Sequence, residues 1–441
     1  MSYEMIATLM FASMMLMLFT GQRVFAAIGF VAALSSVLLW GTGGVEIPFS
    51  SAMKLMQWYV LLTLPMFIFM GYVLSESRIA DDLYRMFHVW MGPLNGGLAI
   101  GTIGLMVLVS AMNGLSVAGM AIGTTIALPE LLRRGYDKIM VTGVIQAGSS
   151  LGILVPPSVV LVLYALIARQ PVGQLWLAGV LPGLMMAGMF ILYIYVRCRM
   201  QPDLGPPIDK EELSKVTLAE KLRLLRAGLL PLGIFAAMMV PFVNGWTSLV
   251  ESAAVGATTA FLVAVVKGRM TREVFENSVR KTLMISCMFM WIILAATGFG
   301  AVFDGLGAVR AIDALFTEQL HLSPWTILIL MQLSFIIMGT FLDDTAMLVI
   351  VAPLYVPLVG ELGFDLIWYG VLYTITTQIA YMTPPFGYNL FLMRAMAPPE
   401  ISLGDIYRSI IPFVLVMALA LTLVMVFPQI ALWLPGYVYG Q

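Results

Sequence analysis

The chain has 441 residues, of which 61% are hydrophobic and 11% are charged, and its mean hydropathy is +0.96. A soluble domain carries about a quarter charged residues, so the composition excludes that class and predicts a multi-pass membrane protein. A formal net charge of −1 gives no basis for binding nucleic acid, and two cysteines, Cys198 and Cys287, indicate neither a disulfide framework nor a metal cluster.

Apolar stretches long enough to cross a membrane, roughly 20 residues each, follow one another along the chain. Met1–Phe19 has no positively charged start and no small-residue cleavage site, so we interpret it as the first span and not as a cleavable signal peptide. The predicted crossings are 3–20, 24–41, 58–75, 139–168, 173–196, 227–243, 249–266, 282–303, 367–395 and 408–431.

Two further apolar blocks, 96–128 and 325–360, are too long for one ordinary helix and polar in the middle. Their centres run from Ser110 to Ser116 and from Gly339 to Thr345. Irregular backbone at membrane depth is tolerated only where protein or water covers it. We therefore predict two re-entrant hairpins, although each block could also be one broken span.

The distribution of cations predicts the orientation of the spans, because cytoplasmic loops are enriched in Lys and Arg. Segments 76–95, 129–138, 197–226 and 267–281 are cationic and are predicted to be cytoplasmic, whereas 304–323 has one cation and several acids and is predicted to lie outside. Both chain ends then lie outside, and the two halves have opposite orientations.

One hydrophobic segment occurs twice, as Pro129–Leu161 and as Pro357–Asn389. A prolyl pair interrupts both copies, and paired breaks in two halves of a chain are typical of transporter sites at a repeat interface. An offset of 228 residues matches Pro129 with Pro357, Gly135 with Gly363, Tyr136 with Phe364, Asp137 with Asp365, and Pro156-Pro157 with Pro384-Pro385. The sequence thus predicts an all-α polytopic membrane protein with inverted-topology repeats, two re-entrant hairpins and two proline-broken helices.

The hairpin tips and the helix breaks are the candidate binding elements. Proline frees a carbonyl one turn back; unwound carbonyls suit hard cations, and half-helix N-termini attract anionic groups. We predict two cation sites, the first from Ser110 and Asn113 with carbonyls near Gly152 and Val155, the second from Gly339, Asp343, Ala380 and Thr383. For any one of these residues close helix packing is the simpler explanation. Asp343 could equally bind a cation or cap a helix, and Asp344 better suits a cap.

The sequence contains no Gly-x-Ser-x-Gly, His-Glu-x-x-His or P-loop pattern. We therefore expect neither an enzyme nor coupling to ATP. His88 and His321 have no second ligand at metal-binding spacing.

Five motifs together resemble the large membrane subunit of tripartite ATP-independent periplasmic (TRAP) transporters over nearly the whole chain. They are Ser110–Ala118, Pro129–Asp137, Gly148–Ser158, Gly339–Asp343 and Thr383–Gly387. The resemblance implies sodium-coupled import of an organic acid across the bacterial inner membrane by an elevator-type mechanism. It also implies two partners, a small four-helix membrane subunit, expected here as a separate chain, and a periplasmic substrate-binding protein.

The resemblance also assigns roles to residues. Sodium ligands map to Ser110, Asn113, Gly152, Val155 and Pro157 in the first site, and to Gly339, Asp343, Ala380, Thr383 and Phe386 in the second. Substrate contacts are expected from Asn113, Ser116, Ser158, Asp344, Thr345 and Asn389. The family's first tip commonly reads Gly-Ser-Ser, whereas this chain has Gly114-Leu115-Ser116, so one hydroxyl is missing.

An elevator divides the chain into a scaffold and a transport unit. The expected units are scaffold spans 1–75, interfacial arm 76–95, transport repeat 96–196, cytoplasmic linker 197–226, scaffold spans 227–303, interfacial arm 304–323 and transport repeat 325–431. Two alternatives remain open: a stand-alone sodium–dicarboxylate or anion symporter that needs no binding protein, and a non-transporting membrane scaffold or channel.

Overall fold

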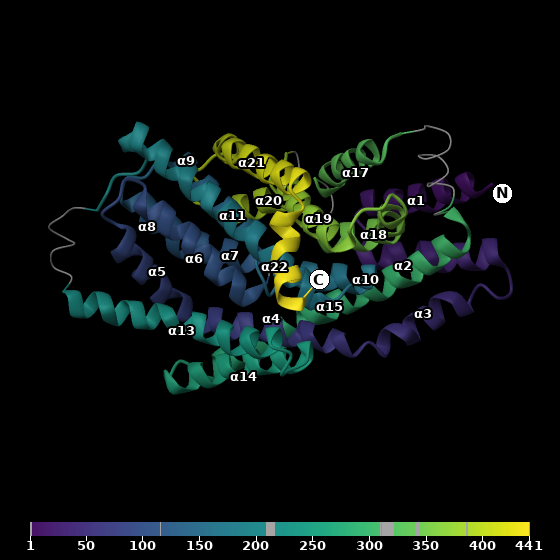
Figure 1. Cartoon of the computed structure of the whole chain (residues 1–441), viewed down its shortest axis with the longest axis horizontal. Coiled ribbons are helices and arrows are strands. Elements are labelled where there is room, and N and C mark those ends of the chain that lie inside the picture. Colours follow the sequence, from purple (N-terminus) through teal and green to yellow (C-terminus); the bar gives the residue numbers. More distant parts are fainter. Residues whose placement is uncertain are drawn as a thin grey trace.

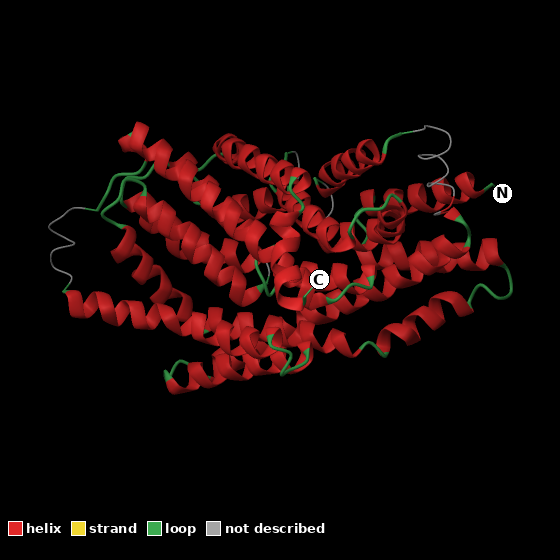
Figure 2. Ribbon diagram, in the orientation of Figure 1, coloured by secondary structure: helices red, strands yellow, loops and turns green. Residues whose placement is uncertain are grey.

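The computed structural model describes residues 2–114, 116–208, 217–308, 310, 322–340, 344–384 and 387–440. All regular secondary structure in these residues is helical (Figure 2). Six of the described helices are long and apolar enough to cross a membrane: Tyr59–Glu76, Val172–Met200, Leu218–Val243, Leu249–Val266, Arg272–Gly305 and Leu403–Val426. Large apolar side chains such as Met56 and Val266 are widely exposed on the outside of the protein, as expected for a surface that lipid covers.

The helices of the first half have counterparts in the second half. The first half contains α1 (Tyr3–Phe19), α2 (Val24–Ser35), α3 (Glu46–Met56), α4 (Thr63–Glu76), α5 (Ile79–Met91), α6 (Gly97–Asn113), α7 (Ser116–Ile122), α8 (Leu128–Arg133), α9 (Lys138–Ser150), α10 (Val159–Ala168) and α11 (Val172–Met200). The second contains α13 (Leu218–Val243), α14 (Leu249–Val266), α15 (Arg272–Gly305), α17 (Pro324–Gly339), α18 (Asp344–Glu361), α19 (Leu366–Tyr381), α20 (Tyr388–Met396) and α21 (Leu403–Val426), and α22 (Gln429–Tyr439) follows them without a counterpart among the described helices. The 228-residue offset relates α9 to α19 and α10 to α20, and it extends beyond the repeated segment to relate α11 to α21.

The duplicated Gly-aromatic-Asp motif is a turn followed by a helix cap. Gly135 and Gly363 adopt φ values of +78° and +80°, a conformation that costs little only for glycine. Asp137 then accepts a hydrogen bond from the Met140 N–H at 2.9 Å, and Asp365 accepts one from the Trp368 N–H at 2.8 Å. Each carboxylate satisfies a free donor at the start of its broken helix, which explains why the motif occurs in both halves.

Glu130 forms ion pairs with the two arginines that precede the Gly135 turn. Its carboxylate pairs with Arg133 at 2.6 Å and with Arg134 at 2.9 Å. Burial raises the pKa of Glu130, but the hydrogen bonds from Arg134 and Arg133 outweigh it and leave the pKa below its ordinary value. The carboxylate is therefore ionised at neutral pH.

The two halves interlock through reciprocal contacts. Helix α10 packs against α18 while α20 packs against α7, and α9 packs against α21 while α19 packs against α11. Each pair of contacts exchanges equivalent elements, as a two-fold relation between repeats requires. Lys138 at the start of α9 also pairs with Asp405 at the start of α21, with 2.7 Å between Nζ and Oδ2.

The remaining helices form a second layer. Helix α15 packs along α2, α3 and α4, and α14 packs against α4, so this layer also joins both halves. In Figure 1, α13, α14 and α3 run along the lower edge, whereas α9, α21 and α17 lie along the upper edge. The N-terminus lies at one end of the long axis and the start of α13 at the other.

The predicted boundaries differ most from the observed helices in the following places. Helix α15 begins at Arg272 and α13 at Leu218, well before the predicted spans at 282 and 227, because capped, charged turns extend both apolar helices. Helix α3 was not predicted. The predicted single span 408–431 divides into α21 and α22 around Pro428, which lacks the N–H that a continuous helix needs.

Helix α5 has the amphipathic character predicted for the segment 76–95. Ile79 and Leu83 are fully buried, whereas Arg85 on the opposite face is exposed. Trp90, predicted on the apolar face with them, is 43% exposed. The helix packs against α6 and α13 and so connects the two layers. Most of its predicted counterpart, 304–323, lies outside the described residues.

Candidate transport site

Both broken helices contain a carbonyl whose α-helical donor position is occupied by proline, which has no N–H. Helix α9 ends at Ser150, a 3-10 turn covers Leu151–Ile153, and α10 begins only at Val159. In an α-helix the Gly152 carbonyl would accept from residue 156 and the Ala380 carbonyl from residue 384, but both positions are proline. Gly152 and Ala380 are thus equivalent residues, and both belong to the predicted cation sites.

The first predicted hairpin tip contacts the first break. Gly114, which joins α6 to α7, has φ +66°, and its carbonyl accepts the Val159 N–H at 3.4 Å. A Cβ atom on Gly114 would lie 2.3 Å from the Pro157 carbonyl oxygen. The structure thereby brings the tip next to Pro157. The side chains of Ser110 and Asn113, on the last turn of α6, lie outside the described residues.

The second half also brings the start of its predicted tip next to its break, through a different pair of residues. A Cβ atom on Gly339, the last residue of α17, would lie 2.5 Å from the Cβ of Ala380. The Ala380 carbonyl accepts the Thr383 N–H at 3.1 Å, and the Thr383 hydroxyl donates to Ile379 O at 2.7 Å. Gly339, Ala380 and Thr383 therefore lie together. Asp343, Phe386 and the side chains of Asp344 and Thr345 lie outside the described residues.

This contact predicts a reciprocal rescue. Gly339→Ala would place two Cβ atoms in conflict and separate α17 from α19, so we expect uptake to fall roughly ten-fold or more. Adding Ala380→Gly should restore much of it, because the swap moves one methyl group across the same contact and keeps the Ala380 carbonyl. Uptake rates of both single variants and the double variant measure this. A double variant as impaired as Gly339→Ala would show that the contact is not the cause.

Two of the predicted substrate residues meet across the repeats. The Ser116 hydroxyl on α7 donates to Asn389 Oδ1 on α20 at 3.1 Å. Asn389 is fully buried, and its amide nitrogen lies 3.5 Å from both Gln146 O and Ser149 Oγ. The cluster thus joins the second hairpin arm of one repeat to the second half-helix of the other.

Ser158 has its hydroxyl engaged locally. It accepts the Leu161 N–H at 3.1 Å as the N-cap of α10 and donates to the Ile153 carbonyl. The Ser158 carbonyl accepts from the Trp176 indole at 3.3 Å. Val155, between these groups, is largely buried. The side chain of Ser158 thus links the end of the 3-10 turn to the start of α10 and stabilises the break.

Buried glutamines are the functional candidates that sequence reasoning missed. Gln146 on α9 and Gln378 on α19 are fully buried, and in both the amide oxygen has no hydrogen-bond partner among the described residues. A signal was present, since each is the sole glutamine in its predicted span, 139–168 or 367–395.

The described residues contain no group of three or more His, Cys, Asp or Glu side chains that could hold a metal ion. Such a cluster suits multivalent transition metals. The observed elements instead offer carbonyl, hydroxyl and amide oxygens, which suit a monovalent hard cation.

Comparison with known proteins decides the family. Residues 11–430 match the model of the family described as "Tripartite ATP-independent periplasmic transporter, DctM component". The chain belongs to this family. As a TRAP transporter large membrane subunit it is a multi-pass protein of the bacterial inner membrane, as predicted, and its relatives are permeases and not enzymes.

Three relatives of this TRAP subunit span nearly its full length. The C4-dicarboxylate TRAP transporter large permease protein DctM of Pseudomonas aeruginosa is 30% identical, over 91% of this chain and 92% of that one. The sialic acid protein SiaM of Vibrio cholerae is 26% identical (96% and 98%), and the ectoine protein TeaC of Halomonas elongata is also 26% identical (97% and 98%).

A solved structure shares the fold. The YdaH transporter of Alcanivorax borkumensis aligns over 96% of this TRAP subunit and 98% of its own chain with a TM-score of 0.66, at 16% sequence identity. At that identity the likeness concerns the fold alone.

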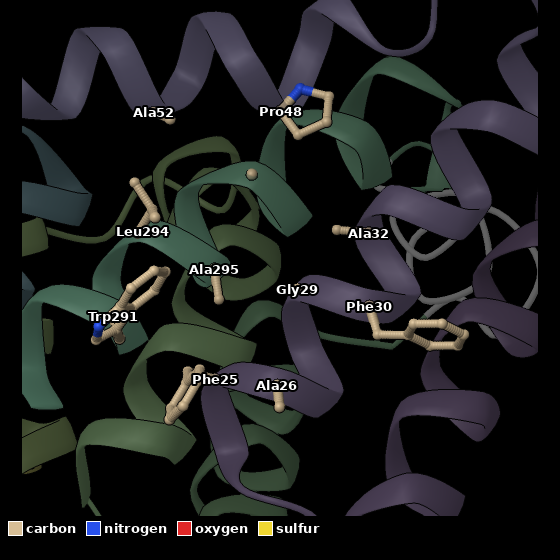
Figure 3. Close-up of a pocket in the computed structure, with 11 residues that line it drawn as sticks. Phe25, Ala26, Gly29, Phe30, Ala32, Pro48, Ala52, Trp291, Leu294 and Ala295 are labelled. Atoms are coloured by element: carbon tan, nitrogen blue, oxygen red, sulfur yellow. The ribbon is translucent and has the colours of Figure 1, made fainter.

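A cavity of about 300 Å³ lies elsewhere in the TRAP subunit, between α2, α3 and α15 (Figure 3). Small residues such as Gly29 and Ala295 form its walls, and the rings of Phe25 and Trp291 lie 5.8 Å apart at one side. No charged side chain and none of the predicted site residues lines it. An organic acid would find no charged partner there, so this cavity is distinct from the tips and breaks.

Proposed function

We propose that this chain imports a small organic acid together with sodium, as the large membrane subunit of a TRAP transporter. The observation that carries the proposal is the duplicated approach of a hairpin tip to a proline break. Gly114 lies against Pro157 in one repeat and Gly339 against Ala380 in the other. Helix packing alone does not require two breaks at equivalent positions, whereas two cation sites flanking one substrate do.

In this proposal sodium ions bind between each tip and break. The first ion uses the carbonyls of Gly152 and Val155 with Pro157, Ser110 and Asn113. The second uses Gly339, Ala380 and Thr383 with Asp343 and Phe386. Cation binding would tie each hairpin to its broken helix and so complete the substrate site.

The substrate carboxylate would lie near the start of α20. Its N-cap, Gly387, has no side chain to occupy the first N–H groups of the helix, and such groups favour an anion. Asn389 and Ser116 lie there as hydrogen-bonding groups, with Asn113, Ser158, Asp344 and Thr345 as further candidates. The named substrates of the three relatives, C4-dicarboxylate, sialic acid and ectoine, all carry a carboxylate, which supports this class.

The proposed movement is an elevator. The transport unit comprises 96–196 and 325–431, whose helices interlock through the α9–α21 and α11–α19 contacts. The scaffold comprises 1–75 and 227–303, joined by the contacts of α15 with α2 and of α14 with α4. The arms at 76–95 and 304–323 would link the two. A periplasmic binding protein would deliver substrate, and a small four-helix membrane subunit would complete the complex.

We expect uptake to require sodium. Proteoliposomes that contain both membrane subunits and receive the loaded binding protein should accumulate substrate under an inward sodium gradient and not under an equal potassium gradient. Asp343→Ala should weaken this sodium dependence more than Asp344→Ala, since Asp343 lies in the tip motif and Asp344 begins α18. Equal uptake with potassium would contradict the coupling, and uptake without the binding protein would favour a stand-alone symporter.

A further inference from the structure

Gln378 forms a direct hydrogen bond between the two broken helices. Its amide nitrogen, on α19, donates to the carbonyl oxygen of Ser150 on α9 at 2.9 Å. Both residues are fully buried. The bond therefore lies in the interior of the interlocked repeats and away from the lipid-facing surface.

This hydrogen bond joins equivalent positions of the two repeats. Ser150 and Gln378 are separated by 228 residues, the same offset that relates the repeats. Equivalent residues of two repeats can contact each other only close to the two-fold axis that relates them. Ser150 comes two positions before Gly152, and Gln378 comes two positions before Ala380. The hydrogen bond therefore connects the two helix breaks, and each of its residues lies only two positions from the proposed cation-binding carbonyl.

The Ser150 carbonyl accepts this bond because the helix tightens there. The Leu154 N–H, its partner in a regular α-helix, donates to Leu151 O instead at 3.1 Å. Gln378 thus donates to a carbonyl at the point where the α-helix changes to a 3-10 turn. A change in the backbone at Gly152 would move this acceptor, and Gln378 would carry the change to the turn that presents the Ala380 carbonyl.

From these contacts we infer that Gln378 is a positioning residue that couples the two cation sites, so that an ion in one site strengthens binding in the other. This inference rests on the proposed sodium-coupled function. Coupling between two sites is reciprocal and appears as cooperative binding. The Gln378 amide oxygen has no partner among the described residues and is free to accept a hydrogen bond from a water or a substrate donor between the sites.

The test is a sodium titration of the purified full chain in detergent, with choline chloride holding the ionic strength constant. Sodium that binds the folded state raises the melting temperature. The wild-type response should be cooperative, with a Hill coefficient approaching about 2, the number of proposed sites. Gln378→Met should give a Hill coefficient near about 1, with the half-effective sodium concentration raised roughly five-fold. Sodium-dependent uptake by the assembled transporter should change in the same way.

Gln332→Met is the matched control. Gln332 on α17 is also a buried glutamine bonded to α19, since its amide oxygen accepts from the Thr376 hydroxyl. That bond joins two helices of the same repeat, so its loss should lower the melting temperature without changing the Hill coefficient. Should Gln378→Met not be monodisperse, Gln378→Asn withdraws the amide from Ser150 by one methylene and carries the same expectation.

The outcomes separate this inference from the proposed function. A wild-type protein that responds to sodium without cooperativity, or a Gln378→Met variant that keeps the wild-type Hill coefficient, overturns the coupling and leaves sodium transport intact. A wild-type protein that shows neither sodium-dependent stabilisation nor sodium-dependent uptake overturns the proposed function and the coupling with it.

Discussion

Gly114→Ala is expected to abolish most uptake while the protein still assembles in the membrane. The new Cβ would lie 2.3 Å from the Pro157 carbonyl oxygen and 3.3 Å from the Val159 nitrogen. Both are backbone atoms of the break and cannot turn aside as the end of a side chain can. The tip would have to retreat from the proposed first cation site, and a displacement of about 1 Å can cost about 100-fold in rate. Sodium-driven uptake in proteoliposomes measures this.

Gly135→Ala supplies the control for backbone strain. Gly135 has φ +78°, close to the +66° of Gly114, but a Cβ atom there would meet nothing within 4 Å. Both variants bear the cost of a left-handed alanine, about 1–2 kcal/mol, and only Gly114→Ala adds the clash. Similar losses of uptake in the two variants would mean that strain, and not contact with the break, determines the effect.

The sequence alone predicted the fold to the level of its repeats. Duplicated prolines and capped Gly-aromatic-Asp turns are local features, so their spacing along the chain locates α9, α10, α19 and α20. Helix α3 and the first turns of α15 escaped prediction because charged residues such as Arg272 and Glu276 lower the local hydropathy, although these two side chains pair at 2.7 Å on the helix surface. The family comparison confirms the predicted membership and membrane location.

The site could be predicted only in part. Offsets in the sequence identify Gly152 and Ala380 as equivalent carbonyls, since both precede a proline by four positions. They do not show which elements of opposite repeats meet. The Ser116–Asn389 bond and the Gln378–Ser150 bond join residues more than 200 positions apart, and they depend on how the repeats interlock. That packing follows from the shapes of many side chains and has no signature in the sequence.

Replacing either prolyl pair by Ala-Ala is expected to abolish transport and preserve the fold. Alanine favours the helix interior over proline by about 3 kcal/mol per residue, and Pro156→Ala would return an N–H to the Gly152 carbonyl. The chain between Ser150 and Val159 would then become helical, and the carbonyls proposed to bind sodium would be engaged in helical hydrogen bonds. The same change at Pro384-Pro385 would give the Ala380 carbonyl, which already accepts the Thr383 N–H at 3.1 Å, an α-helical donor at position 384. The measurements are monodispersity in detergent, melting temperature and sodium-driven uptake.

Pro231→Ala in α13 is the matched control, because this proline lies inside a continuous helix of the proposed scaffold. Pro231→Ala should raise the helix propensity of α13 without making either broken helix continuous. Uptake should therefore remain close to the wild-type rate. Near-normal transport by both double variants would overturn the proposed sites, because ions would then bind without the freed carbonyls. Aggregation of both would show that the breaks are required for folding, since closing them would push α10 and α20 away from α18 and α7, the hairpin arms of the opposite repeat that they contact. Loss of uptake in stable, monodisperse protein is the result that assigns the prolines to transport.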